Sequence, residues 1–174
     1  KSNQIETEHL TDDTHLLFSY HGLPISHVKR IDSTKKHCQI IDQCCTVKCE
    51  ANQLCYGHHC YKTTMAVVER LGLPPEGWSL SYQSRLGPVK WLEPSTTQMV
   101  ENLVKKGIKN LAIVAPAFLA DGLETLEELD IGIREEFMEH GGLELKVINC
   151  LNDDQQWVQG LEQLISKEFE RIAA

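Results

Sequence analysis

Residues 16–24, which read LLFSYHGLP, decide the fold of this 174-residue chain. The segment begins with an apolar run long enough for one short buried strand, and the run stops at His21. Gly22 and Pro24 follow directly and end the strand. We therefore expect an imidazole at the carboxyl end of a strand, the edge at which open α/β sheets bind ligands. Imidazole can carry a proton or bind a metal near neutral pH, although most strand-end histidines only form structural hydrogen bonds.

Strands and helices are expected to alternate along the rest of the chain. Short apolar or alternating segments predict strands, and an apolar stripe at helical spacing predicts helices. The strands are expected at residues 16–21, 78–83, 110–115 and 143–149, and the helices at residues 61–71, 95–106, 123–140 and 153–172. This order predicts an α/β fold of the Rossmann-like type, with a parallel four-stranded sheet flanked by helices on both faces.

One domain is expected to account for most of the length. Residues 1–14 are polar and should form an amino-terminal extension, and residues 15–174 should form a single α/β domain with a cysteine-rich insert at about residues 35–60. The last helix is expected to close the fold through an apolar face formed by Trp157, Leu161, Leu164, Ile165 and Phe169. The chain has no initiator methionine, which suggests a fragment of a longer protein.

The composition is that of an ordinary globular protein, with 41% hydrophobic and 24% charged residues. The formal net charge is -8, and lysine and arginine are scattered without a basic stripe, so nucleic acid is not an expected partner. No apolar run approaches the roughly 20 residues that span a bilayer, and the amino terminus has no signal-peptide core. We therefore expect a cytoplasmic protein without a transmembrane segment, for which peripheral association with a membrane stays open.

Three strand-end loops are expected to meet at one edge of the sheet. The first loop carries His21, and the second carries Arg85 and Trp91. The third carries acids three and four residues apart, namely Asp121, Glu124 and Glu128. This spacing places carboxylates on one helical face. Acids in a first helical turn often only complement the helix dipole, but beside a strand-end histidine they would suit a divalent metal.

Four motifs together resemble the carboxyl-terminal half of the ferrochelatases. They are residues 17–24 (LFSYHGLP), 82–87 (YQSRLG), 91–94 (WLEP) and 123–129 (LETLEEL), in the same order and at similar spacing. Members of that family insert ferrous iron into protoporphyrin IX to form protohaem, the last step of haem biosynthesis. Their fold has two similar Rossmann-like domains of the chelatase type, with a porphyrin cleft between them. The resemblance implies that this chain is the second domain, that the amino-terminal half is its missing partner, and that the chain alone is inactive.

The resemblance assigns roles to residues of this sequence. His21 and Glu124 match the catalytic histidine and the acid that faces it across the cleft. Iron binding is implied for both, and for Glu128 and Asp121, which match an acidic line that leads toward the surface. Contacts with the porphyrin are implied for Tyr20, Arg85 and Trp91. The chemistry agrees, because metal insertion expels two pyrrole protons and needs a base near the ring centre, and ferrous iron needs oxygen or nitrogen ligands weak enough to release it.

Two departures from the family pattern leave other functions open. Gly122 stands where some relatives have a histidine, two residues before the matching acid, and a Gly-Asp-Pro-Tyr segment that follows the first motif in many bacterial members is not found. One alternative is a chelatase for another metal and another tetrapyrrole. The other is a non-catalytic member of the family that binds haem or senses iron or redox state.

Six of the seven cysteines lie within the insert, namely Cys38, Cys44, Cys45, Cys49, Cys55 and Cys60. His37, His58 and His59 stand near them, and no CxxC pair is present, which argues against a standard zinc finger or ribbon. Any four of the six thiolates would satisfy a [2Fe-2S] cluster, which some ferrochelatases carry, or a zinc ion. Disulfides and free thiols stay open as alternatives.

Overall fold

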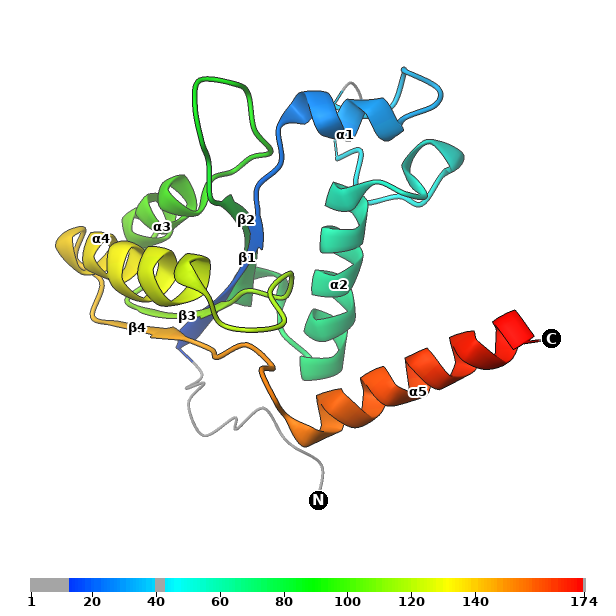
Figure 1. Cartoon of the computed structure of the whole chain (residues 1–174). Helices are drawn as coiled ribbons and strands as arrows, with labels where there is room; N and C mark the ends of the chain where they lie inside the picture. Colours follow the sequence, from blue (N-terminus) through cyan, green and yellow to red (C-terminus); the bar gives the residue numbers. More distant parts are fainter. Residues whose placement is uncertain (1–12, 40–42, 174) are drawn as a thin grey trace.

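The computed structural model describes residues 13–39 and 43–173. Four parallel strands form one sheet in the order β2-β1-β3-β4. Their bounds are Thr14–His21 for β1, Trp78–Gln83 for β2, Asn110–Val114 for β3 and Glu144–Val147 for β4. The strand bounds expected from the sequence agree with these to within two residues, and the predicted parallel sheet is confirmed (Figure 1). Most of the predicted amino-terminal extension and a short part of the cysteine insert lie outside the described residues.

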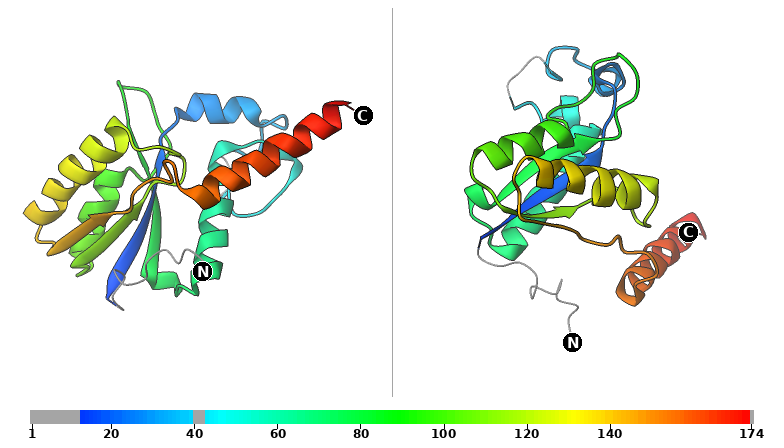
Figure 2. Two further views of the ribbon diagram at one scale, coloured as in Figure 1. Left: turned by 60° about the horizontal axis from the view of Figure 1, so that its bottom comes forward. Right: turned by 90° about the vertical axis from the view of Figure 1, so that its left-hand side faces the viewer.

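Helices cover both faces of the sheet, as predicted (Figure 2). Their bounds are Tyr56–Leu71 for α2 on one face, and Thr96–Lys105 for α3, Glu124–Ile133 for η4 and Arg134–Glu139 for α4 on the other. Side chains of β1 alternate between the two faces. Phe18 is fully buried in the core under α2, and Leu17 is fully buried in the core under α3 and α4. Burying each side chain contributes about 1.5–3 kcal/mol.

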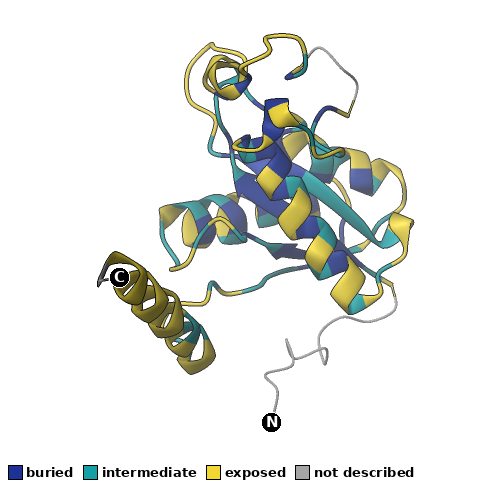
Figure 3. Ribbon diagram, turned by 90° about the vertical axis from the view of Figure 1, so that its right-hand side faces the viewer, coloured by how far each residue is buried: buried dark blue, intermediate teal, exposed yellow. Residues whose placement is uncertain are grey.

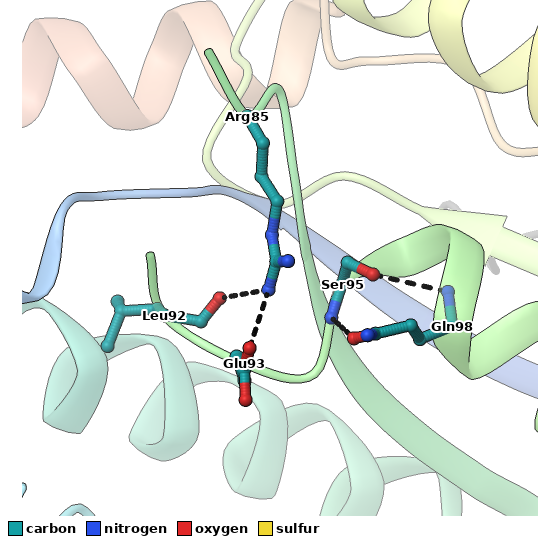
Figure 4. Close-up of polar contacts among 5 residues, drawn as sticks. All are labelled: Arg85, Leu92, Glu93, Ser95 and Gln98. Atoms are coloured by element: carbon teal, nitrogen blue, oxygen red, sulfur yellow. Dashed lines mark hydrogen bonds and ion pairs between the residues drawn. The ribbon is translucent and has the colours of Figure 1, made fainter. Parts of the chain in front are cut away.

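Local sequence explains where two of these helices begin or end. α2 ends at Gly72, whose φ of 66° is left-handed and therefore suits glycine. Ser95 caps α3, as predicted: its Oγ accepts a hydrogen bond from the Gln98 backbone nitrogen at 3.2 Å. The Gln98 side-chain oxygen in turn accepts one from the Ser95 backbone nitrogen at 3.3 Å (Figure 4). These reciprocal bonds satisfy two backbone donors that a helix start leaves open.

The helical prediction needs three corrections. α2 begins at Tyr56 and not at residue 61. The sequence did not indicate this first turn, because it contains glycine and two histidines and has no apolar stripe. A further helix, α1 (Ile25–Ile31), was not expected, since Val28 is its one buried residue. The single helix expected at residues 123–140 consists of the π-helix η4 followed by α4. π-Helices are rare and often occur at functional sites. Two short 3-10 helices, η2 (Glu50–Asn52) and η3 (Pro75–Gly77), complete the list.

The last helix, α5 (Gln155–Ala173), does not close the fold as expected. It extends away from the sheet, and its apolar face is open to solvent (Figure 3). Phe169 is 68% exposed and Leu164 is 62% exposed, although Trp157 at the start of the helix is half-buried. The apolar stripe was predicted correctly, but no other described element covers it. Among the described residues, no helix is both long and apolar enough to cross a membrane.

Candidate active site

His21 ends β1 at the carboxyl edge of the sheet and is half-buried. Its Nδ1 lies 2.6 Å from the backbone oxygen of Gly22. Because a carbonyl oxygen can only accept, Nδ1 carries the proton of the neutral ring. No described residue bonds to Nε2, so this atom is left as the basic nitrogen. A Cβ on Gly22 would lie 2.7 Å from the Gln83 backbone oxygen, so glycine is required for the close approach behind the histidine.

The loop after β2 folds over the segment that follows His21. Trp91 forms an isolated bridge with Pro24, and its ring would lie 3.3 Å from a Cβ placed on Gly22. The indole therefore packs directly beside the residue that follows the histidine. Its Nε1 is buried, with no hydrogen-bond partner among the described residues. Trp91 is thus placed close to His21, and its contact with a porphyrin stays a prediction.

Arg85 is held within the same loop. Its Nη2 donates to the Leu92 backbone oxygen at 3.1 Å and lies 3.5 Å from the Glu93 carboxylate (Figure 4). The Arg85 side chain is 31% exposed, and the donors on its Nη2 are used by the loop itself. The remaining N–H donors of the Arg85 guanidinium are those that an acidic ligand could bind.

The loop after β3 brings two further residues to this edge. The ring centroid of Phe118 lies 6.1 Å from that of His21. Gln83, which pairs with His21 in the sheet register, donates from Nε2 to the backbone oxygen of Glu124 at 2.8 Å. The Gln83 side-chain oxygen accepts from Ser19 Oγ at 2.7 Å. All three strand-end loops therefore meet around His21, and buried polar contacts fix the start of η4 there.

The three predicted acids have different surroundings. The Glu124 carboxylate accepts no hydrogen bond from a described residue. Asp121 accepts a bond from Asn152 Nδ2 at 2.7 Å, and this contact is the main reason that the pKa of Asp121 lies below its ordinary value. Glu128 accepts bonds from the backbone nitrogen and Oγ of Ser84, at 2.7 and 2.6 Å. Among the described residues, no three acidic, histidine or cysteine side chains form a ready metal site.

A cavity of about 340 Å³ adjoins this edge of the sheet. It lies between the end of β2, the start of α3 and η4, and its lining includes Ser84, Arg85 and Glu128. A second cavity, of about 510 Å³, is larger but lies at the opposite edge, where Thr14 and Asn110 begin their strands. The smaller cavity is therefore the one next to the predicted functional residues.

Tyr20 is placed in the core and not on the edge surface. It is 3% exposed, packs under α2, and its Oη lies 2.9 Å from Thr64 Oγ1. Burial raises the pKa of Tyr20 to about 12. In this chain the residue joins β1 to α2, and its contact with a porphyrin stays a prediction.

Four cysteines gather at the amino end of α2. Cys55 is the residue that caps this helix, and the Cys45 thiol bonds to it, which lowers the pKa of Cys55 and raises that of Cys45. The Cys44 and Cys45 sulfur atoms are 3.9 Å apart. Burial, followed by the nearby Cys55 and Cys44 thiols, raises the pKa of Cys38 to about 12. These four residues, Cys38, Cys44, Cys45 and Cys55, are called the thiol cluster below.

The other two cysteines of the insert, Cys49 and Cys60, have further neighbours outside this cluster. The Cys49 sulfur lies 3.7 Å from both ring nitrogens of His37. Cys60 is buried within α2 beside Tyr56, and its pKa is raised to about 12, mainly by burial. All seven cysteines of the chain are free thiols in this structure. Cys49 therefore has different neighbours from the thiol cluster, whereas Cys60 also lies near Cys55 and packs in the same core as Cys38 and Cys55.

Three residues of the site were not identified from the sequence. Gln83 is a polar residue at the end of a buried strand, and this position is a sequence signal that could have identified it. Phe118 lies in the strand-end loop that carries the predicted acids, and a single aromatic residue in a loop does not by itself indicate a functional role. Tyr56, which donates from Oη to the backbone oxygen of His21 at 2.8 Å, lies in a segment without apolar periodicity and gave no signal.

The fold and site define a Rossmann-like α/β protein with a histidine and a carboxylate at the carboxyl edge of a parallel sheet. The family model described as ferrochelatase matches residues 2–169, and the chain belongs to the ferrochelatase family. The ferrochelatase of Bdellovibrio bacteriovorus is 45% identical over 151 residues, covering 87% of this chain and 44% of that protein. The ferrochelatase of Pseudomonas fluorescens (strain Pf0-1) is 44% identical over 161 residues, covering 91% and 47%.

The chain spans about half the length of these curated relatives. Among solved structures, it resembles a cobalamin (vitamin B12) biosynthesis CbiX protein from Marinobacter aquaeolei VT8. That comparison has a TM-score of 0.50 and 15% sequence identity, and it covers 92% of this chain and 98% of the other. At this identity the likeness concerns the fold alone.

Proposed function

We propose that this chain forms the histidine-bearing wall of an enzyme that inserts ferrous iron into protoporphyrin IX and releases protohaem. One observation carries the proposal: His21 presents a free, basic Nε2 at the edge where Gln83 holds the start of η4 and thus Glu124. Membership of the ferrochelatase family supports the reaction class.

The proposed reaction exchanges two protons for one metal ion. Ferrous iron and the free-base porphyrin give the iron porphyrin and two protons, with no change of oxidation state. His21 Nε2 is suited to accept a pyrrole proton because Nδ1 already donates to Gly22. Glu124, whose carboxylate has no described partner, is suited to receive the second proton or to hold the arriving iron.

The remaining predicted residues would guide the two substrates. Asp121 and Glu128 flank Glu124 in sequence, and each keeps lone pairs beyond those used by its present partners, so both could contact iron on its way in. Trp91 could pack against the macrocycle, and the free donors of Arg85 could bind a propionate group. A role for Tyr20 would require its ring to act from within the core.

The other wall of the porphyrin site belongs, in this proposal, to the amino-terminal half of the protein. Support comes from the length of the curated relatives and from the exposed apolar face of α5, which would be covered by a larger partner surface. We therefore propose that the 174-residue chain alone does not metallate porphyrin. Turnover by this chain without the other half would contradict that statement.

A non-catalytic haem-binding role is the second candidate. Gly122 and the engagement of Asp121 and Glu128 by hydrogen bonds favour it, since both features reduce the number of free groups near Glu124. Absorbance spectroscopy of the full-length protein separates the two roles: a catalyst converts protoporphyrin and ferrous iron to protohaem, whereas a binding module only shifts the porphyrin spectrum. Competition between ferrous iron and cobalt in the same assay distinguishes a chelatase for another metal.

We also propose that the thiol cluster, defined above as Cys38, Cys44, Cys45 and Cys55, holds a [2Fe-2S] cluster or a zinc ion. Four thiols near one helix start supply the donor type that either group needs, because thiolates are soft ligands and the exposed N–H groups of the helix start favour negative charge. Among the described residues they do not form a ready metal site, so the proposal requires them to move together when the group binds. Iron, sulfide and zinc analysis of anaerobically purified full-length protein tests this. Colourless protein without iron or zinc would contradict it.

A further inference from the structure

The end of β1 is supported unequally on its two sides. Pairing with β2 continues to the last residue of the strand, where His21 lies opposite Gln83. Pairing with β3 stops three residues earlier, at Phe18 and Val114. The residues that carry the histidine therefore have a strand neighbour on one side only. A position that must hold a side chain to within a fraction of an ångström needs another support.

Tyr56 supplies a support from α2. Its Oη donates a hydrogen bond to the backbone oxygen of His21 at 2.8 Å, although the two residues are 35 positions apart in the chain. We infer that Tyr56 is a positioning residue for His21: it fixes the end of β1, and through it the direction of the imidazole. This inference rests on the proposed role of His21.

The surroundings of Tyr56 suit a fixed donor. Its ring packs against the core cluster under α2, next to Cys60. Burial, followed by the nearby Cys60, raises the pKa of Tyr56, so the phenol stays protonated at any physiological pH. A half-buried, neutral phenol has one proton to donate, and packing of its ring limits the direction of that hydrogen bond. The carbonyl of His21 is its acceptor.

The same residue connects the histidine to the cysteine insert. Tyr56 is the first residue of α2, and the residue before it, Cys55, caps the helix and bonds to Cys45. Any displacement of Cys55 is transmitted through one peptide bond to Tyr56, and from there through one hydrogen bond to His21. The positions of the cysteines in the thiol cluster are thereby coupled to the position of His21 in the candidate active site.

The test compares Tyr56→Phe with Tyr61→Phe in the full-length protein. Both changes remove one hydroxyl from α2, but the Tyr61 hydroxyl makes no hydrogen bond to a described residue. For Tyr56→Phe we expect kcat for porphyrin metallation to fall about tenfold, because a small misplacement of a reacting group is costly. The KM for porphyrin should change less than about twofold, since ground-state binding is untouched. Tyr61→Phe should leave both constants unchanged.

A second measurement reads the position of His21 without using activity. In the ¹⁵N spectrum of histidine-labelled protein, the His21 imidazole signal is assigned by its loss in His21→Gln. Tyr56→Phe should shift or broaden this signal, and Tyr61→Phe should not. An unchanged His21 signal in folded Tyr56→Phe protein would overturn the inference. Absence of metallation by the wild-type protein, with the His21 signal shifted as expected, would instead count against the proposed function alone.

The coupling to the cysteines is tested by a double-mutant cycle. If Cys55→Ser acts on His21 through Tyr56, its effect on the His21 signal should be largely absent in the Tyr56→Phe background, so the two effects are not additive. Additive effects on the signal would overturn this coupling.

Discussion

Gln83 lies beside His21 in the sheet, and its side chain is hydrogen-bonded to the backbone of Glu124. His21 and Glu124 are the two residues to which the proposed reaction assigns proton transfer. Gln83 lies opposite His21 in the register of β1 and β2, and its Nε2 donates to the backbone oxygen of Glu124 at 2.8 Å. The side-chain oxygen of Gln83 accepts a hydrogen bond from the buried Ser19 hydroxyl. The start of η4 is therefore fixed to the strand that lies beside the histidine, by a residue that need not touch a substrate.

Replacing Gln83 should separate these two residues. Gln83→Met keeps the shape of the side chain but removes both hydrogen bonds, leaving the Ser19 hydroxyl without this acceptor. We expect the free energy of unfolding of the full-length protein to fall by about 1–3 kcal/mol, with a lower kcat. Denaturant unfolding and steady-state assays measure the two effects. Gln163→Met, on exposed α5, is the control, and equal stability of the two variants would contradict the assigned role.

Asp121 predicts a dependence of stability on acid pH. Its pKa in the folded protein lies below the ordinary value of 3.8, chiefly because Asn152 bonds to it. The ionised carboxylate therefore stabilises the fold above pH 3.8, and this contribution disappears as the pH falls through the lower, folded pKa. Asp121→Asn should cost at most about 1 kcal/mol at neutral pH, because the group is largely solvated.

The difference between wild type and Asp121→Asn should shrink as the pH falls below 3.8, and unfolding curves collected at several pH values measure it. Glu127→Gln, which changes an exposed acid in the helix η4 that follows Asp121, provides the control and should show no such trend. A difference that grows toward low pH would refute the assignment.

Asp32 organises the start of the cysteine insert. Its carboxylate accepts hydrogen bonds from the backbone nitrogens of His37 and Cys38, each at 2.9 Å. The Thr34 hydroxyl is the main group that lowers the pKa of Asp32, so the carboxylate stays ionised at neutral pH. Asp32→Ala should release Cys38 and reduce the iron or zinc retained per chain. Metal analysis after gel filtration measures this, with the exposed Asp153→Ala as control. Unchanged metal content in Asp32→Ala would show that Asp32 does not support the proposed iron or zinc site.

The apolar face of α5 predicts a contact with the rest of the protein. Phe169 and Leu143 are equally open here, at 68% and 69% exposure. If the amino-terminal half covers α5, Phe169→Ala should destabilise the full-length protein by about 3–5 kcal/mol, the usual loss for a buried phenylalanine. Leu143→Ala should cost less than about 0.5 kcal/mol. Equal, small effects in thermal unfolding would show that α5 is not covered.

The sequence predicted the sheet well because buried parallel strands leave a direct signal in apolar runs. The run that ends at His21 and the nearly continuous apolar segment of β3 each specify one strand. Helix faces were harder, since an apolar stripe shows that a helix is amphipathic without showing what covers it. For α5 the stripe was correct and the expected packing was wrong.

The site was predictable where chemistry and position coincide in one residue. His21 at a strand end, and Glu124 at the start of a helix, could be selected from their neighbours in sequence. Tyr56 could not, because its importance arises from a hydrogen bond to a residue 35 positions away. The π-helical form of η4 was also missed, since residues four apart share a face in either helix and the spacing of its acids does not distinguish them.

The central claim is that His21 acts as the base of a metal–porphyrin chelatase. The most direct measurement is anaerobic conversion of protoporphyrin IX and ferrous iron to protohaem by the full-length protein, compared with its His21→Gln variant. We expect turnover by the wild type and a loss of at least about 100-fold in kcat for the variant, with porphyrin binding retained in both. Equal rates for the two proteins, or porphyrin binding without any metallation by the wild type, would contradict it.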